Sequence, residues 1–360
     1  MFCRHGRRED RCPICAKAKR QPPARSGSSS GARSTSGTAA ARPVRSSASG
    51  SARRSRGSGD VRVRKLSRHA DDGWRSDLLP GVLGSAEALE LCRFLLRARL
   101  RLEALAGPDA PGPYGRAATL AAGTAAEREE AAWLLFQVAY YGPVEGEGAF
   151  LEIARLAVDW TAPLPDDATL RTARVGPRGA HDHARGATTL VAYREWAQRA
   201  GGQLAALGAA TAGQSDPARR FDAAFRALAL PGLSRGPRFE LLLSLAAVGL
   251  LDAQPWSLLL DASRDPVGVA AKRAFRSDDG VLLQRRLGAL ARALALPVAA
   301  FDLGLRNWDA APKDRLTGGV PVQEDPDEVA LLGEALGIVP DAPAAAEADA
   351  GSGDVAPVDG

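Results

Sequence analysis

Side chains suited to bind a metal are crowded into the first fifteen residues. Cys3, His5, Cys12 and Cys15 have the order C-x-H, then six residues, then C-x-x-C. Zinc prefers four thiolate or imidazole ligands in a tetrahedron, and a CxxC turn presents two thiolates to one ion. We therefore predict a zinc knuckle over residues 1–20, in which a structural Zn²⁺ supplies the folding free energy that so short a segment lacks. The alternatives are a redox CxxC pair, which normally lies in a βαβ unit, and chance spacing.

A second group of polar residues interrupts the apolar segment LPVAAFDLGLRNWD at 296–309. A carboxylate in such a setting is costly unless it is paired or used, so Asp302 is a candidate general base or charge stabiliser with a raised pKa. The alternatives are a helix cap and a structural ion pair with Arg306, which lies one helical turn further on. Asn307 could bond a base edge, and Trp308 could stack on a base taken out of the duplex or simply fill the core.

Basic residues gather at two loops between apolar segments. Lys272 and Arg273 end the connection RDPVGVAAKRAF at 264–275 and suit a phosphate or pyrophosphate, although a solvated helix face would carry the same residues. Arg235 and Arg238 belong to the turn LPGLSRGPR and the helix expected after it. A turn of this form between two helices can present backbone N–H groups to a DNA phosphate, but it also connects helices in ordinary bundles.

Two histidines and a lone cysteine lie outside these groups. His181 and His183 belong to the polar, glycine-rich loop GPRGAHDHARG at 176–186. They could bind a metal, although no third ligand is evident nearby, or they could line a polar pocket. Cys92 falls within an apolar helical pattern, and we expect it to be a small buried side chain.

These residues must be positioned by helices, because helical periodicity dominates the chain from 75 to 338. Apolar residues recur at helical spacing in five stripes, which begin at Leu89, Phe150, Phe221, Phe239 and Leu283. Residues 126–141 and 189–207 are also helical by propensity, whereas the one clear alternation is VRVRK at 61–65. We therefore predict an all-α body of about eight to eleven helices, the first of them capped by Ser85.

Charge and composition set the two ends of the chain apart from this body. Residues 1–68 hold 18 Lys or Arg and 3 Asp or Glu, whereas residues 324–360 hold 10 acids and no base. We expect 21–74 to be a disordered basic linker, rich in Ser, Gly and Arg, and 339–360 to be a disordered acidic tail. A basic arm favours attraction to nucleic acid, although a GC-rich genome produces a similar composition.

The sequence contains no candidate membrane segment. Its longest apolar run, LLLSLAAVGLL at 241–251, is too short to span a bilayer. The charged N-terminus is unlike a signal peptide, and the few cysteines fit a reducing compartment. We therefore expect a cytoplasmic protein without a membrane partner.

Several of these segments together resemble one known family. They are RFDAAFRALALPGLSRGPRFELLLSLAAVGL at 220–250, AAKRAF, a helix containing QRR, FDLGLRNW at 301–308, the loop GPRGAHDHARG and the start HGRREDRCPIC. They resemble the bacterial clade of the α-glutamyl/putrescinyl thymine pyrophosphorylase family, which is related to the helix-hairpin-helix DNA glycosylases. The resemblance covers most of 75–320 and the first twenty residues, and it implies a glycosylase-like all-α fold.

The related glycosylases carry a hairpin of the form LPG-x-G-x-K and, further on, a proline followed five residues later by the catalytic aspartate. Pro297 and Asp302 have that spacing. The hairpin match is incomplete, since LPGLSRG at 230–236 lacks the lysine and PVGVAAK at 266–272 lacks the LPG. Which loop is the hairpin, and whether a lysine-based glycosylase mechanism applies, therefore stays open.

The resemblance implies that an amine, from glutamate or putrescine, displaces pyrophosphate from a 5-pyrophosphorylmethyl-uracil in DNA. Asp302 would deprotonate or orient the amine, with Lys272 on the pyrophosphate and Asn307 on the flipped base. The expected substrate and DNA contacts are Arg235, Arg238, Arg273, Arg306, Trp308, His181 and His183. The expected partners are the DNA backbone, a flipped base and a hydroxymethyluracil-DNA kinase of the same pathway. The alternatives are a DNA glycosylase that excises a modified base and a non-catalytic DNA-binding module.

Overall fold

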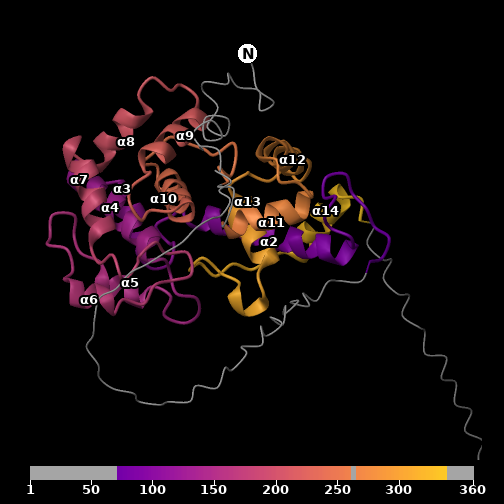
Figure 1. Ribbon diagram of the computed structural model, residues 1–360, viewed down its shortest axis with the longest axis horizontal. Coiled ribbons are helices and arrows are strands. Elements are labelled where there is room, and N and C mark those ends of the chain that lie inside the picture. The colour runs from indigo at the N-terminus through magenta and orange to yellow at the C-terminus, as the bar shows by residue number, and fades with distance from the viewer. Residues whose placement is uncertain (1–70, 261–264, 339–360) are drawn as a thin grey trace, which may run out of the picture. The chain divides into compact units, whose positions relative to one another are not determined.

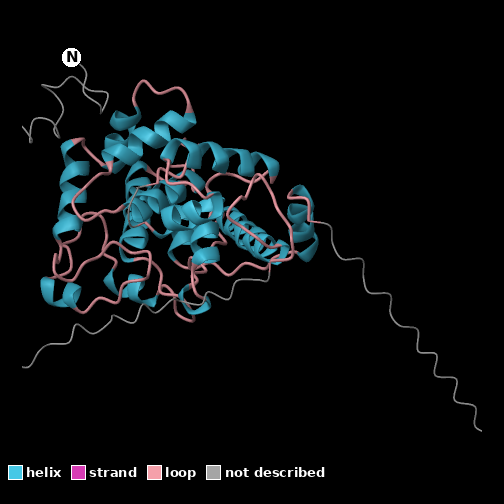
Figure 2. Ribbon diagram, turned by 45° about the vertical axis from the view of Figure 1, so that its right-hand side comes forward, coloured by secondary structure: helices cyan, strands magenta, loops and turns pink. Residues whose placement is uncertain are grey.

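Every regular element in the described part of the chain is a helix (Figure 1; Figure 2). The computed structural model describes residues 71–260 and 265–338, which contain 13 α-helices and one short 3-10 helix at Pro312–Asp314. The prediction of an all-α body is confirmed for these residues. The helices outnumber the expected eight to eleven, partly because α6 (Asp167–Arg171) is too short to show a periodic stripe. The stripe that begins at Phe150 corresponds to a helix of only six residues, α5 (Leu151–Leu156).

Several predictions concern residues outside the described ranges. They are the zinc knuckle at 1–20 with its ligands Cys3, His5, Cys12 and Cys15, the alternation at 61–65, most of the linker at 21–74 and the acidic tail at 339–360. These stay predictions from the sequence.

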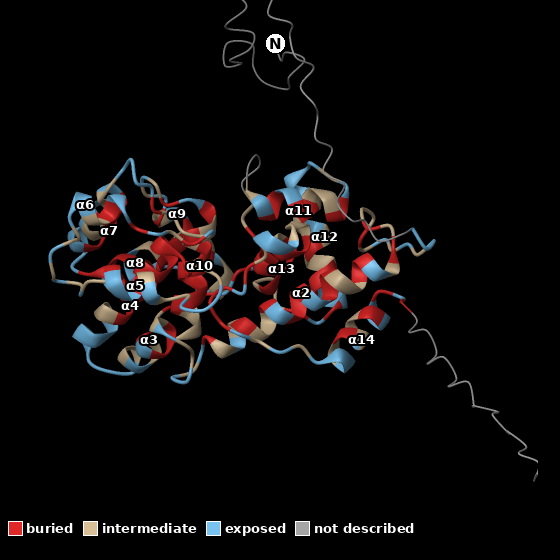
Figure 3. Ribbon diagram, turned by 90° about the horizontal axis from the view of Figure 1, so that it is seen from below, coloured by how far each residue is buried: buried red, intermediate tan, exposed pale blue. Residues whose placement is uncertain are grey.

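One group of helices is built around α2 (Ser85–Ala104) and α13 (Ala300–Asp309), which pack against each other. Helix α14 (Pro326–Ala335) also packs on α2. Helix α11 (Pro266–Phe275) packs on α13, and α12 (Gly280–Ala293) packs on α11 (Figure 3). This group therefore places α2 and α11 against α13, although α2 lies near the start of the described residues.

The other group of helices surrounds α4 (Ala125–Tyr141), whose last eleven residues are all buried. A capping box between Thr124 and Glu127 starts this helix. The main helices around it are α3 (Pro113–Ala121), α7 (Thr188–Arg199), α8 (Gln203–Thr211), α9 (Pro217–Ala227) and α10 (Arg235–Ala247). Helix α10 contacts α4, α9 and also α2, so it links the two groups.

Two predicted helix boundaries are wrong for identifiable reasons. Residues 189–207 form two helices, because Gly201 and Gly202 adopt φ values of +86° and +148° that end α7 before α8 begins. Ser85 does not cap α2, since Gly84 is the N-cap and the Ser85 hydroxyl bonds to Asp72 instead. The turn LPGLS, by contrast, does connect two helices as expected, α9 and α10.

Candidate functional site

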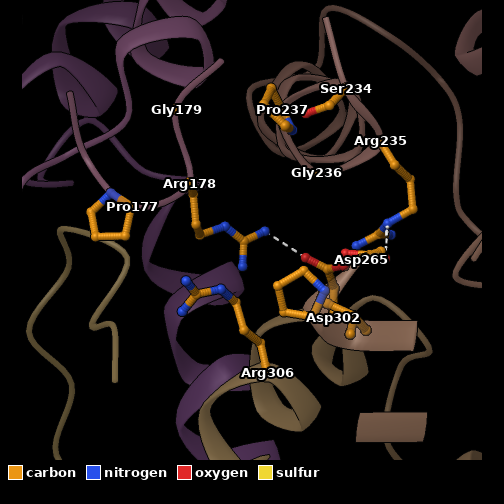
Figure 4. A pocket seen from close by; sticks show the side chains of 12 residues that line it. Pro177, Arg178, Gly179, Ser234, Arg235, Gly236, Pro237, Asp265, Asp302 and Arg306 are labelled. Atoms are coloured by element: carbon orange, nitrogen blue, oxygen red, sulfur yellow. Dashed lines mark hydrogen bonds and ion pairs between the residues drawn. The ribbon is translucent and has the colours of Figure 1, made fainter. Parts of the chain in front are cut away.

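A cavity of about 450 Å³ lies where the beginnings of α10 and α11 meet α13 and the loop between α6 and α7 (Figure 4). It is lined by Pro177–Gly179 of that loop, Ser234–Pro237 of α10 and its N-cap, Asp265–Val267 of α11 and its N-cap, and Asp302 and Arg306 of α13. Helix N-termini carry partial positive charge and unpaired N–H groups. The convergence of helix beginnings therefore favours a negatively charged ligand.

Close backbone contacts hold the loop that carries Arg178. The N–H of Gly176 donates to the carbonyl of Tyr141 at 2.9 Å. A Cβ on Gly179 would lie 2.2 Å from the same carbonyl oxygen, and a Cβ on Gly176 would lie 2.3 Å from that of Pro143. Only glycine allows these approaches, so the end of α4 fixes the position of the loop.

Asp302 lines the cavity and is only 1% exposed. Its two carboxylate oxygens accept hydrogen bonds from different guanidinium groups, one from Arg178 and the other from Arg235. Burial alone would raise the pKa of this carboxyl, but the charges of Arg235 and Arg178 outweigh it and hold the pKa at about 2. The raised pKa that the general-base prediction required is therefore wrong. The alternative of a structural ion pair fits better, but the partners of Asp302 are Arg178 and Arg235 instead of Arg306. With this pKa, Asp302 is a poor proton acceptor at neutral pH.

A second buried carboxylate, that of Glu240, pairs with the same terminal nitrogen of Arg178 that bonds to Asp302. Glu240 Oε2 lies 3.5 Å from Arg178 Nη2, and the other carboxylate oxygen of Glu240 pairs with Arg101. Arg101 also donates to the Tyr114 hydroxyl at 3.2 Å. Arg101, Glu240 and Tyr114 are all buried, so this network restricts Arg178 to one orientation.

Arg235 joins two carboxylates of the cavity. One of its terminal nitrogens donates to Asp302, its Nε lies 2.5 Å from Asp265 Oδ2, and its Nη1 donates to the Leu258 carbonyl at 2.8 Å. Burial raises the pKa of Asp265 above its ordinary value, against the opposing effect of Arg235. The two carboxyl groups therefore differ, since the pKa of Asp302 is lowered and that of Asp265 is raised.

Arg306 is the third guanidinium of the cavity and lies beside that of Arg178 (Figure 4). Burial lowers the pKa of Arg306, and the neighbouring charge of Arg178 lowers it further. Arg306 Nη1 reaches the Asp314 carbonyl at only 3.5 Å. Arg178 Nη1 is buried and has no hydrogen-bond partner within the described residues. Two adjacent cations with donors to spare suit an anionic ligand, which would offset their repulsion.

The cavity contains some of the residues that the sequence singled out and adds others. Asp302, Arg235 and Arg306 line it as candidate site residues. The sequence did not single out the other charged members of the site, which are Arg178, Asp265 and Glu240. Glu240 carried a usable signal, because it is a lone carboxylate in the apolar run FELLLSL, just as Asp302 is in FDLGL.

The expected pyrophosphate ligands of α11 do not line the cavity. Lys272 Nζ lies 3.2 Å from a carboxylate oxygen of Asp278. Arg273 lies 2.6 Å from Asp309, and its guanidinium carbon is 4.2 Å from the ring centre of Trp308. Arg273 therefore ties α11 to α13 and packs on the aromatic ring.

Three more expected contacts are also absent from the cavity lining. The side-chain amide of Asn307 exchanges two hydrogen bonds with the backbone of Leu316. Trp308 is 3% exposed and belongs to the core. Arg238 lies over the ring of Phe225, 4.2 Å from its centre. In this structure these side chains stabilise the fold around the site.

The two histidines fasten the loop between α6 and α7. His181 Nδ1 lies 2.6 Å from the Tyr140 hydroxyl, and its Nε2 lies 2.8 Å from the Leu170 carbonyl oxygen. His183 Nε2 lies 2.7 Å from the carbonyl oxygen of Ala173. Within 71–260 and 265–338, no group of three or more His, Cys, Asp or Glu could hold a metal ion.

Cys92 is fully buried, as expected, and burial raises the pKa of its thiol to about 12. The thiol is therefore unsuited to nucleophilic chemistry.

Among the residues that the structure describes, no helix has both the length and the apolarity needed to cross a bilayer.

No family model, curated protein or solved structure matches this chain. The resemblance to the pyrophosphorylase family therefore stays a prediction from sequence patterns.

Proposed function

We propose that this protein is a DNA-base-modifying enzyme of the kind that its sequence resembles, in which an amine displaces pyrophosphate from a 5-pyrophosphorylmethyl-uracil. The observation that carries the proposal is the adjacent pair of Arg178 and Arg306 in a cavity lined by helix N-termini. Pyrophosphate is a multiply charged leaving group, and its charge grows as the C–O bond breaks. Cations fixed before the reaction stabilise such a transition state without reorganisation.

In this proposal the pyrophosphate binds to Arg178 and Arg306 instead of Lys272 and Arg273. The beginning of α10 supplies further donors, because Gly236 lines the cavity and a Cβ there would meet nothing within 4 Å. Its backbone is therefore accessible to a ligand, as anion sites at helix N-termini require.

Asp302 has a positioning role in this arrangement. It holds Arg178 and Arg235 by one carboxylate oxygen each, so it keeps the cations in place while the substrate is absent. A low pKa suits this role, since the carboxylate stays ionised throughout the neutral range. Asp302 thus belongs to the site, as its spacing from Pro297 indicated. The role of general base falls to another group.

DNA reaches the cavity as a flipped base. The volume of about 450 Å³ falls within the range of roughly 300–1,000 Å³ for small-molecule sites, whereas a stacked base cannot enter such a site. The basic residues of 1–68 add attraction to the phosphate backbone, and the N-terminal zinc knuckle adds a further contact. A hydroxymethyluracil-DNA kinase supplies the substrate in the cytoplasm.

Binding of inorganic pyrophosphate, measured by isothermal titration calorimetry, tests the anion site. The Arg306→Gln variant should bind about tenfold to a hundredfold more weakly, because a charge-assisted hydrogen bond contributes about 1.5–3 kcal/mol. Arg285→Gln is the matched control, since Arg285 is an exposed arginine of α12 outside the cavity. Equal affinity of wild type and Arg306→Gln would contradict the assignment.

The fate of the DNA separates this function from its alternatives. DNA containing 5-pyrophosphorylmethyl-uracil is incubated with the protein and putrescine, and released pyrophosphate and abasic sites are measured. If the proposed reaction occurs, pyrophosphate is released only when the amine is present, and the glycosidic bonds of the DNA stay intact. Abasic sites would indicate a glycosylase, and binding without either product would indicate a DNA-binding module.

A further inference from the structure

The proposed reaction contains a proton transfer for which no group has yet been assigned. A primary alkyl amine such as putrescine is an ammonium ion at neutral pH, and it must lose a proton before its nitrogen can attack. A carboxylate near the reacting carbon can accept such a proton. Two carboxylates line the cavity, Asp302 and Asp265.

The surroundings of Asp302 exclude it from this role. Both of its oxygens accept hydrogen bonds from guanidinium groups, and the residue is 1% exposed. A proton on either oxygen would break an ion pair with Arg178 or Arg235. Protonation would therefore dismantle the arrangement that holds the pyrophosphate.

Asp265 is placed differently in the same cavity. It is the N-cap of α11, and its side chain is 12% exposed. One carboxylate oxygen pairs with Arg235 Nε at 2.5 Å, and no second guanidinium pairs with Asp265 in the described part of the chain. This carboxylate can take a proton while Arg235 remains held by Asp302 and by the carbonyl of Leu258.

We propose that Asp265 is the catalytic base that deprotonates the attacking amine; this inference rests on the proposed function. The ammonium donates one proton to the Asp265 carboxylate and becomes a neutral amine. The nitrogen lone pair then forms the C–N bond at the 5-methylene carbon, while the C–O bond breaks and its electron pair leaves with pyrophosphate. The product is a protonated secondary amine, and Asp265 returns its proton to water. The raised pKa of Asp265, caused by burial, suits a group that must accept and release a proton.

The test compares Asp265→Asn with wild type on DNA containing 5-pyrophosphorylmethyl-uracil, using two amines. With putrescine, which needs a base, pyrophosphate release should slow by about a hundredfold to ten-thousandfold. With hydroxylamine, which is already neutral at pH 7, the defect should largely disappear. The acid limb of the wild-type pH profile with putrescine should also be lost in the variant.

The matched control is Asp325→Asn. Asp325 is also an N-cap followed by proline, at the start of α14, and it lies outside the cavity lining. Its variant should show wild-type rates with both amines. If Asp265→Asn does not fold, Asp265→Ser keeps an N-cap side chain and allows the same comparison.

The outcomes distinguish failure of this inference from failure of the proposed function. Wild-type rates of Asp265→Asn with putrescine would overturn the inference and leave the function intact. Equal defects with putrescine and hydroxylamine would also overturn it, because they would indicate a structural role. If wild type releases no pyrophosphate with either amine, the proposed function itself fails.

Discussion

Replacing Asp302 with Asn should destabilise the protein strongly at neutral pH. The carboxylate is 1% exposed and bonds to two buried or nearly buried guanidinium groups, those of Arg235 and Arg178. An uncharged amide leaves both cations without that partner, and removing one member of a buried pair costs about 3–5 kcal/mol. Arg178 retains Glu240, and Arg235 retains Asp265. We therefore expect the lower end, about 3 kcal/mol of unfolding free energy.

The same contacts make this loss depend on pH in a definite direction. The pKa of Asp302 is about 2 in the folded protein, against an ordinary value of 3.8. Because the folded value is the lower one, the ionised carboxylate stabilises the fold above pH 4. That contribution, about 2 kcal/mol, is lost as the pH falls from about 4 to about 2. The gap between wild type and Asp302→Asn should therefore shrink on acidification.

Urea denaturation at pH 7, pH 4 and pH 3, followed by circular dichroism, measures both effects. Asp278→Asn is the control, since the side chain of Asp278 is 89% exposed and its removal should change stability little. Equal stability of Asp302→Asn and wild type at pH 7 would refute the reasoning. A gap that widens on acidification would refute it as well.

Three other outcomes are expected. Gly179→Ala should weaken pyrophosphate binding in calorimetry, because its Cβ would lie 2.2 Å from the Tyr141 carbonyl oxygen and displace the loop that carries Arg178. The control Gly208→Ala should leave binding unchanged, because its Cβ would meet nothing within 4 Å. Identical effects of the two substitutions would disprove the loop's role. Deletion of residues 1–70 should reduce the salt dependence of DNA binding, and an unchanged slope of affinity against salt would exclude phosphate contacts by that arm. Metal analysis should find one zinc per chain that is lost with the same deletion, and a metal-free full-length protein would contradict the predicted knuckle.

The sequence was informative where a single charged residue interrupts an apolar segment. Asp302 was recognisable because a carboxylate interrupts an apolar helix, and the structure shows it buried and fully paired. Its partners were not recognisable. Arg306 is the helical neighbour of Asp302, but the partners are Arg235 and Arg178, the latter 124 residues away in sequence. They meet because α10 and the loop before α7 border the same cavity as Asp302.

The helical class was predictable because apolar residues repeat at helical spacing, and the folded helices bury those apolar stripes. Local propensity could not show that Gly201 and Gly202 divide one predicted helix in two, since that depends on backbone φ values. It also could not show which basic residues face the cavity. Lys272 and Arg273 lie in a segment typical of phosphate binding, yet they pair with other parts of the protein.

The stoichiometry of the reaction on DNA tests the central claim most directly. DNA containing 5-pyrophosphorylmethyl-uracil is incubated with the full-length protein and putrescine, and its nucleosides are analysed by mass spectrometry alongside the released pyrophosphate. The account predicts one aminated thymidine for each pyrophosphate released, with the base still joined to its sugar. An excised base, or a substrate that remains unchanged while Arg178 and Arg306 bind pyrophosphate, would contradict it.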